Sequence, residues 1–205
     1  PAFSPEEIHR RKTVIKSSIL QQNEEPEVVA SKAFLKAVFG QHPYGRPIEG
    51  TEETLENITR QDIVDFHTSQ YIPNNTIMAV VCDIDKNKLN YFLDKYLKNW
   101  LKKEAAANSL PELKSADRIE VIKINKSITQ ANIILGHLGI KRDNPDYYAV
   151  SVMNYILGGG GFASRLMDNI RDNKGLSYDV HSYFSSNKFA GSFQAGLQTK
   201  NQTAN

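Results

Sequence analysis

The sequence predicts an α+β fold in which helices pack against mostly antiparallel sheets. Three observations support this class. Segments with helical periodicity and apolar segments of strand length follow one another in irregular order, which is typical of α+β proteins. Two strand-like segments near the C-terminus are joined by a short turn, as in a hairpin. The 205 residues are 40% hydrophobic and 23% charged, which is an ordinary globular composition.

The first predicted helix begins after Ser4 and ends between residues 23 and 26. Ser4 can cap the helix, Pro5 suits the first helical position, and Glu7 stands three residues after the cap as its reciprocal partner. Apolar residues then recur on one face at Ile8, Ile15 and Ile19. Pro26 cannot continue the helix.

Two further helices follow before a buried strand. Residues 27–39 are predicted to form one helix that ends at Gly40. Residues 41–50, with two prolines and two glycines, are predicted to form a loop. Another helix begins at residues 59–62. After a turn at residues 73–75, the run TIMAVVCDI (76–84) predicts a strand that is buried on both faces.

The next helix is predicted from a regular apolar pattern between residues 89 and 100. Residues 103–116 carry charge, small residues and a proline without any period, and we interpret them as a linker. This linker separates a first region, 1–102, from a second region, 117–205. The apolar residues that predict the helix between residues 89 and 100 are Leu89, Phe92, Leu93, Tyr96, Leu97 and Trp100.

The second region reads as strands around one helical stretch. Residues 118–125 and 128–140 alternate like paired strands, and Asn144 with Pro145 opens a helix that runs to Leu157. Residues 176–184 and 189–200 then predict a hairpin turning at Ser186 and Asn187.

Composition excludes several classes of function. The formal net charge is +2 and no basic stripe interleaves with aromatic residues, which disfavours nucleic acid as a partner. The single cysteine, Cys82, excludes an internal disulfide and a cysteine-based zinc site. No apolar run approaches the ~20 residues that span a bilayer. The cellular compartment is undetermined, with the bacterial periplasm or another exported compartment as the working guess.

No metal or nucleophile motif is present in the sequence. None of the five histidines has a partner at ligand spacing, because both His-x-x-Glu-His and His-Glu-x-x-His are absent. A Gly-x-Ser-x-Gly elbow is absent too. We therefore predict no metal site in this chain. The histidines are His9, His42, His67, His137 and His181.

The run of four glycines, Gly158, Gly159, Gly160 and Gly161, has three interpretations. A phosphate-binding loop is disfavoured because the run follows a helix and no Lys-Ser/Thr comes after it. A flexible connector between helices is the second interpretation. The third is a loop whose bare backbone lies against an extended peptide, since glycine allows another main chain to approach closely.

Arg171 and Tyr178 favour the third interpretation. Arg171 ends a short helical pattern and Tyr178 begins the next strand, so a tight turn at Lys174 and Gly175 would bring their side chains towards one point. A guanidinium and a phenol can both donate hydrogen bonds to a peptide carbonyl or to its oxyanion. A surface cation beside an edge-strand aromatic is the structural alternative.

Two blocks of the sequence resemble the pitrilysin/insulinase-type (inverzincin) zinc peptidases, the family that includes mitochondrial processing peptidase. The first block, HPYGRPIEGTEETLENITRQDIVDFHTSQYIPNN (42–75), resembles the late part of that family's first domain. The second, DNPDYYAVSVMNYILGGGGFASRLMDNIRDNKGLSYDVHSYF (143–184), resembles the glycine loop and Arg/Tyr segment of the following domain. Together they imply that residues 1–102 end a first peptidase-like domain and that 117–205 begin a second, inactive-type domain.

The resemblance implies a role for each site residue. In this family two similar lobes pair around a chamber, one carrying zinc and the other supplying an arginine and a tyrosine that hold the substrate backbone. Arg171 and Tyr178 match that pair, and Gly158 to Gly161 match the substrate loop. We therefore expect a peptide substrate, a zinc-bearing subunit or dimer partner, and no cofactor in this chain itself.

The resemblance also predicts that the metal site has been lost. The helix after Ser4 resembles the helix that bears the distal zinc glutamate, and the ligand position falls at Ser17 or Ser18, where a hydroxyl is a poor zinc ligand. The chain is thus expected not to be catalytic by itself. Two alternatives stay open: a structural scaffold subunit, and an active zinc endopeptidase with its metal motif upstream and Glu24 or Glu25 as a ligand.

Overall fold

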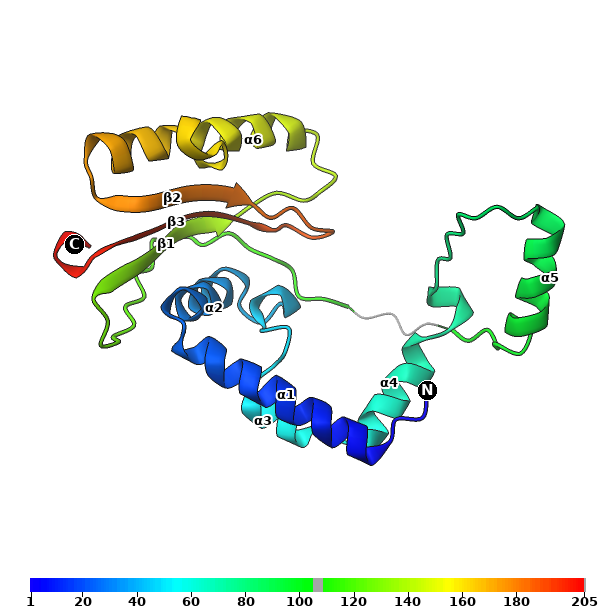
Figure 1. Ribbon diagram of the computed structural model, residues 1–205. Helices are drawn as coiled ribbons and strands as arrows, with labels where there is room; N and C mark the ends of the chain where they lie inside the picture. Colours follow the sequence, from blue (N-terminus) through cyan, green and yellow to red (C-terminus); the bar gives the residue numbers. More distant parts are fainter. Residues whose placement is uncertain (105–108, 205) are drawn as a thin grey trace. The chain divides into compact units, whose positions relative to one another are not determined.

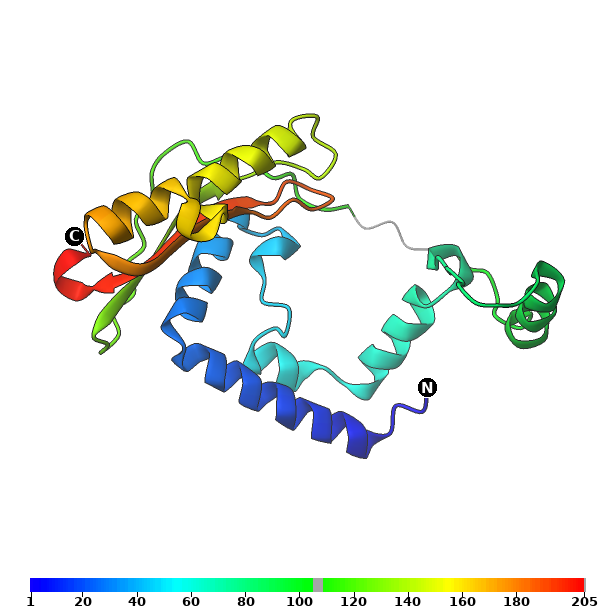
Figure 2. The same cartoon turned by 45° about the horizontal axis from the view of Figure 1, so that its top comes forward.

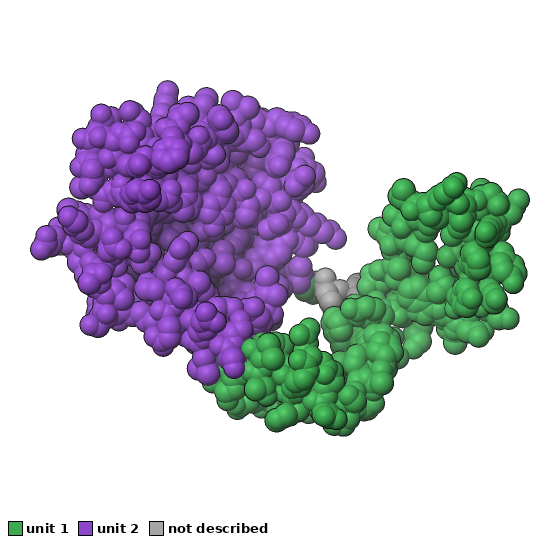
Figure 3. Space-filling view, in the orientation of Figure 1, with its two compact units in different colours: residues 1–16, 51–109 green, residues 17–50, 110–205 purple. Residues whose placement is uncertain are grey.

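The computed structural model describes residues 1–104 and 109–204, and these form two compact units. One unit comprises residues 1–16 and 51–109, and the other comprises 17–50 and 110–205 (Figure 3). Each unit is therefore assembled from two separate stretches of the chain. The predicted linker at 103–116 remains a prediction, and its residues 105–108 lie outside the described residues.

The first unit is helical. It contains the beginning of α1 (Pro5–Glu24), followed by α3 (Glu52–Asn57), α4 (Arg60–Gln70), the 3₁₀ turn η2 (Pro73–Asn75) and α5 (Lys86–Leu97). The second unit combines helices with a sheet. Its elements are the end of α1, α2 (Pro26–Phe39), η1 (Pro43–Gly45), β1 (Gln130–Leu138), α6 (Tyr147–Asn154), η3 (Tyr155–Gly159), η4 (Gly161–Ala163), η5 (Met167–Asn173), β2 (Ser177–Phe184), β3 (Ser192–Lys200) and η6 (Asn201–Thr203).

The predicted starts of α1 and α4 are confirmed by their caps. The Thr59 hydroxyl accepts a hydrogen bond from the Asp62 amide, and the Asp62 carboxylate accepts one from the Thr59 amide at 2.7 Å. At α1 the Ser4 hydroxyl accepts from the Glu7 amide at 3.4 Å, but the Glu7 carboxylate pairs with Arg10 rather than with the cap. This exposed ion pair lowers the pKa of Glu7.

Helix α3 was not predicted, although the sequence at its start contains a capping motif. Helix α3 begins with a capping box in which the Thr51 and Thr54 hydroxyls each accept a hydrogen bond from the other's backbone amide. Threonine at the third helical position replaces the usual Glu or Gln. Leu55 of this helix is buried within the first unit.

The two strands predicted at residues 76–84 and 118–125 are absent from the structure. Residues 76–84 form no strand, and Ile77 and Val81 are 99% exposed. Residues 118–125 form none either, with Ile119 91% exposed. A strand needs a neighbour to take up its backbone hydrogen bonds. Within the described part of the chain, the sheet consists of β1, β3 and β2 alone, and neither apolar segment pairs with it.

The sheet of the second unit is antiparallel throughout, which confirms the α+β class. Its order is β1-β3-β2, with Ile133 opposite Leu197 and Val180 opposite Leu197 on the other side. The predicted hairpin of β2 and β3 is therefore correct. The predicted pairing of residues 128–140 with 118–125 is wrong, because β1 pairs with β3 instead.

Helices cover both faces of this sheet (Figures 1 and 2). On one face α2 approaches so closely that a Cβ atom at Gly136 of β1 would lie 2.7 Å from the Phe34 ring. On the other face α6 and η3 approach β2, where the Asn154 side chain donates to the Ser182 carbonyl at 3.1 Å and accepts from its hydroxyl at 2.9 Å. These bonds fix the segment that leads into the glycine run.

Candidate functional site

A sharp reversal between η5 and β2 places Arg171 beside Tyr178. Gly175 has φ of +60°, a left-handed conformation that glycine adopts without strain. Its amide donates to the Arg171 carbonyl at 3.0 Å, and the Leu176 amide donates to the Ile170 carbonyl at 3.0 Å. These bonds close the end of the π-helical turn η5, and β2 begins two residues after Gly175.

The two side chains predicted to converge lie in contact. The guanidinium carbon of Arg171 is 5.2 Å from the centre of the Tyr178 ring. This is within the ~6 Å range of a cation–π interaction. Tyr178 is 84% exposed and the Arg171 side chain is 29% exposed. The pair is therefore accessible to a ligand from solvent.

The neighbouring Asp172 carboxylate neutralises the positive charge of Arg171 only weakly. Its Nη1 atom lies 3.8 Å from the Asp172 carboxylate, whose side chain is 53% exposed. An exposed ion pair at this distance contributes little. The guanidinium thus keeps hydrogen-bond donors that an incoming carbonyl or carboxylate can use.

The first glycine of the run packs closely against β2. Gly158 is buried, and a Cβ atom there would lie 2.6 Å from the Ser182 amide nitrogen. Gly161 has φ of +58°, and a Cβ atom built on it would meet no heavy atom within 4 Å outside its chain neighbours. The run therefore consists of a tightly packed beginning in η3 and an exposed turn at its end.

Sequence reasoning missed one residue of this site, Phe162. Its ring centre lies 4.8 Å from the guanidinium carbon of Arg171, and the side chain is 72% exposed. Arg171 accordingly contacts two aromatic rings. The available signal was an aromatic residue directly after the glycine run, within the same block as Arg171.

The described residues offer no cluster for a metal. Among residues 1–104 and 109–204, no three His, Cys, Asp or Glu side chains are grouped so that they could hold an ion. At the position expected for the zinc glutamate, the Ser18 hydroxyl accepts a hydrogen bond from Gln22 at 3.3 Å within α1. That hydroxyl serves a local contact on one helix.

Comparison with known families decides the membership of the chain. Residues 57–205 match the model described as "Peptidase M16 inactive domain", which is well over half of the chain. The chain belongs to the peptidase M16 inactive-domain family. This confirms the resemblance to the non-zinc lobe of the inverzincin peptidases.

Curated relatives of this M16 chain are longer proteins. It is 30% identical over 181 residues to an uncharacterized zinc protease of Mycobacterium leprae, covering 86% of this chain and 40% of the relative. It is 28% identical over 190 residues to the uncharacterized zinc protease YmxG of Bacillus subtilis, covering 92% of this chain and 45% of the relative. The chain thus spans less than half the length of these relatives.

A solved structure confirms the fold. A peptidase M16 inactive domain from Pseudomonas fluorescens superposes with a TM-score of 0.82 at 31% identity, over 98% of this chain and 48% of that chain. A protease from Helicobacter pylori, at 21% identity, has the same fold with a TM-score of 0.79 over 96% of this chain and 48% of that one.

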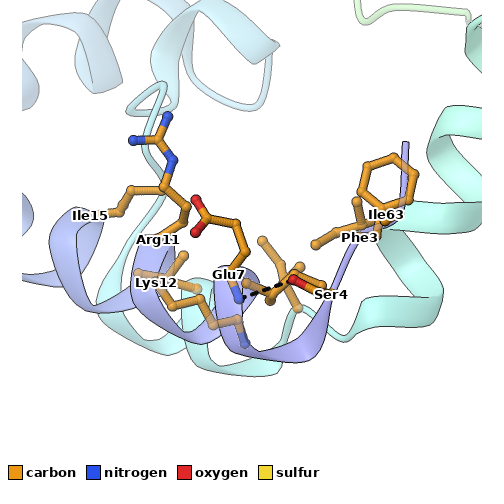
Figure 4. A pocket seen from close by; sticks show the side chains of 11 residues that line it. Phe3, Ser4, Glu7, Arg11, Lys12, Ile15 and Ile63 are labelled. Carbon is orange, nitrogen blue, oxygen red and sulfur yellow. Dashed lines mark hydrogen bonds between the residues drawn. The ribbon is translucent and has the colours of Figure 1, made fainter.

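A hollow lies in the first unit of the M16 chain, far in the sequence from Arg171 and Tyr178. It has a volume of about 580 Å³ and is formed by α1, α3 and the start of α4. Figure 4 shows Phe3, Ile15 and Ile63 lining it, with Glu7 and Arg11 among the charged residues. Glu7 is the one carboxylate among the lining residues and pairs with Arg10, so we do not assign the hollow the chemistry of a catalytic site. Across the described residues, no helix is sufficiently long and apolar to cross a membrane.

Proposed function

We propose that this chain is part of a non-zinc lobe that binds peptide substrate for hydrolysis by a zinc-bearing partner lobe. The observation that carries the proposal is the contact between Arg171 and Tyr178, at 5.2 Å and open to solvent. Such an exposed pair contributes little to a core, whereas its donors suit a polypeptide backbone.

The chemistry of the pair fits the scissile region of a peptide. The Arg171 guanidinium is a planar cation with five donors, and the Tyr178 phenol supplies another donor. Donors aimed at a carbonyl strengthen as negative charge develops on its oxygen during hydrolysis. The two side chains would thus grip the substrate and stabilise the transition state together.

The glycine run supports the same role at its exposed end. Gly161 is exposed, and a Cβ atom built on it would meet no heavy atom within 4 Å outside its chain neighbours, so an extended substrate can approach the backbone on that side. Gly158 is packed against β2 and would act as the anchor of the loop. Zinc held by the partner lobe would supply the Lewis acidity for hydrolysis.

The test is to purify the full-length protein with its zinc-bearing partner and measure casein cleavage by each component and by the assembly. The proposal predicts cleavage by the assembly, little cleavage by the full-length protein alone, and zinc in the partner. An assembly that contains zinc but cleaves nothing would instead favour the scaffold function.

A second candidate function is favoured by the relatives' names. Both curated relatives are called zinc proteases, so the full-length protein itself could bind zinc and cleave peptides. Zinc analysis of the full-length protein alone separates the candidates. About one bound zinc per chain would favour this second function, and its absence would favour the non-zinc lobe.

A further inference from the structure

We propose that Phe162 is a positioning residue that holds the Arg171 guanidinium against Tyr178 in the orientation that receives substrate. This inference rests on the proposed function and adds a third residue to its site. Phe162 acts through Arg171 and makes no hydrogen bond to the peptide itself, because its side chain has no donor.

The geometry places the arginine in contact with two rings. The guanidinium carbon of Arg171 lies 4.8 Å from the centre of Phe162 and 5.2 Å from that of Tyr178. Both distances fall within the cation–π range. The nearest carboxylate, Asp172, is 3.8 Å away and cannot fix the guanidinium bidentately at that distance. The two rings are therefore the main restraints on the end of this side chain.

The backbone around Phe162 is fixed at both ends. The Gly160 amide donates to the Tyr155 carbonyl at 2.9 Å, and the Ser164 amide donates to the Gly161 carbonyl at 3.0 Å. Ser164 is 1% exposed, and its hydroxyl accepts from the Met167 amide at 3.4 Å. The left-handed conformation of Gly161 turns the chain between these anchors. Phe162 consequently has a defined position although its ring is 72% exposed.

Exposure of the ring argues for a role outside the core. Other residues, such as Met167 and Val180, are buried in the core of the second unit. An exposed phenylalanine contributes little hydrophobic stabilisation, whereas its contact with Arg171 restricts a long and flexible cation. Restricting that side chain in advance reduces the entropy lost when a carbonyl binds to it.

The first experiment measures binding of fluorescein-labelled casein, an extended polypeptide probe, to the full-length protein. A cation–π contact at an exposed site corresponds to an expected weakening of about two- to fivefold in Phe162→Ala. Phe162→Tyr keeps an aromatic face and should bind like the native protein. Tyr148→Ala removes an aromatic residue that is 79% exposed on α6, and serves as the matched control with unchanged affinity.

A double variant separates positioning from direct contact. If Phe162 acts through Arg171, adding Phe162→Ala to Arg171→Ala should weaken casein binding no further. An additional loss in the double variant would overturn the positioning role. If Arg171→Ala itself leaves binding unchanged, the proposed function fails; if only Phe162→Ala leaves it unchanged, the present inference alone fails.

A second readout requires no ligand. Arginine-selective ¹⁵N labelling of the full-length protein gives the Nε–Hε signal of Arg171, which Arg171→Lys identifies by its disappearance. The order parameter of this signal should fall in Phe162→Ala and be retained in Phe162→Tyr. An order parameter that is equally high in Phe162→Ala would overturn the inference, whatever the binding data show.

Discussion

Arg171 and Tyr178 stand seven residues apart in the chain, yet the guanidinium carbon lies 5.2 Å from the tyrosine ring. The reversal at Gly175 produces this contact, because two amides after η5 bond back to carbonyls of that turn. The backbone conformation at one glycine therefore determines whether two side chains from different elements can act on one ligand.

Gly175→Ala should separate the pair or destabilise the second unit. A Cβ atom at Gly175 meets nothing within 4 Å, so the cost is conformational, about 1–2 kcal/mol for an L-residue with left-handed backbone. Gly175→Asn should cost less, because asparagine tolerates this conformation. Chemical denaturation of the full-length variants measures the difference. Equal stability of the two variants would contradict the assigned strain.

Gly158→Ala should destabilise the protein for a steric reason. The new Cβ atom would lie 2.6 Å from the Ser182 amide nitrogen and 2.8 Å from a methyl group of Leu166, so the backbone must shift. Overpacking of this kind costs about 1–3 kcal/mol. Thermal unfolding of the full-length protein should show a lower Tm. A Gly158→Ala variant as stable as the native protein would show that η3 does not need this close approach.

His42→Ala should be strongly destabilising although His42 lies in a loop. The side chain is 1% exposed, packs against the rings of Phe39, Tyr44 and Phe189, and its Nδ1 accepts the Tyr44 amide at 3.2 Å. Truncation leaves a cavity and an amide without its acceptor, at a cost of about 2–4 kcal/mol.

The exposed His9 gives a matched control for that variant. His9→Ala should change the free energy of unfolding by no more than about 0.5 kcal/mol, as is usual for exposed positions. Comparable losses from the two histidine variants would contradict a structural role specific to His42.

Asp62 should give the first unit a dependence on acidic pH. Hydrogen bonds from the Thr59 hydroxyl and amide lower the pKa of the Asp62 carboxyl below its ordinary value of 3.8. A lowered pKa in the folded state means that the contribution is fully present above about pH 4. The contribution is lost as the pH falls through the folded-state pKa.

Asp62→Asn tests this sign directly, because asparagine retains an acceptor and does not titrate. Thermal unfolding from pH 6 to pH 2.5 should show the difference between native protein and variant shrinking as the pH falls. A difference that stays constant, or grows, would contradict the stabilising role of the ionised carboxylate.

The elements that the sequence predicted well are those governed by local chemistry. Helix α4 has its Thr59–Asp62 capping box, and the end of α2 has Gly40 with φ of +54°. The approach of Arg171 to Tyr178 was predictable for the same reason, since it depends on one turn. The family and the α+β class were also correct.

What failed depended on partners distant in sequence. The apolar pattern of residues 76–84 fits a buried strand, but pattern alone does not supply the neighbouring backbone that a strand requires. Phe162 was missed because cation–π contacts have no sequence period. The packing role of Gly158 was missed because its contact, Ser182, is distant in the sequence and belongs to β2.

The central claim is that Arg171 and Tyr178 hold substrate while the metal is held elsewhere. Its most direct test is casein turnover by the full-length protein assembled with its zinc-bearing partner, compared for native protein, Arg171→Ala and Tyr178→Phe, with zinc content measured in each assembly. Loss of one donor that stabilises a developing oxyanion costs about 10²–10³ in kcat, so we expect turnover to decrease by a factor approaching that size while the zinc content stays unchanged. Native turnover in both variants would contradict it.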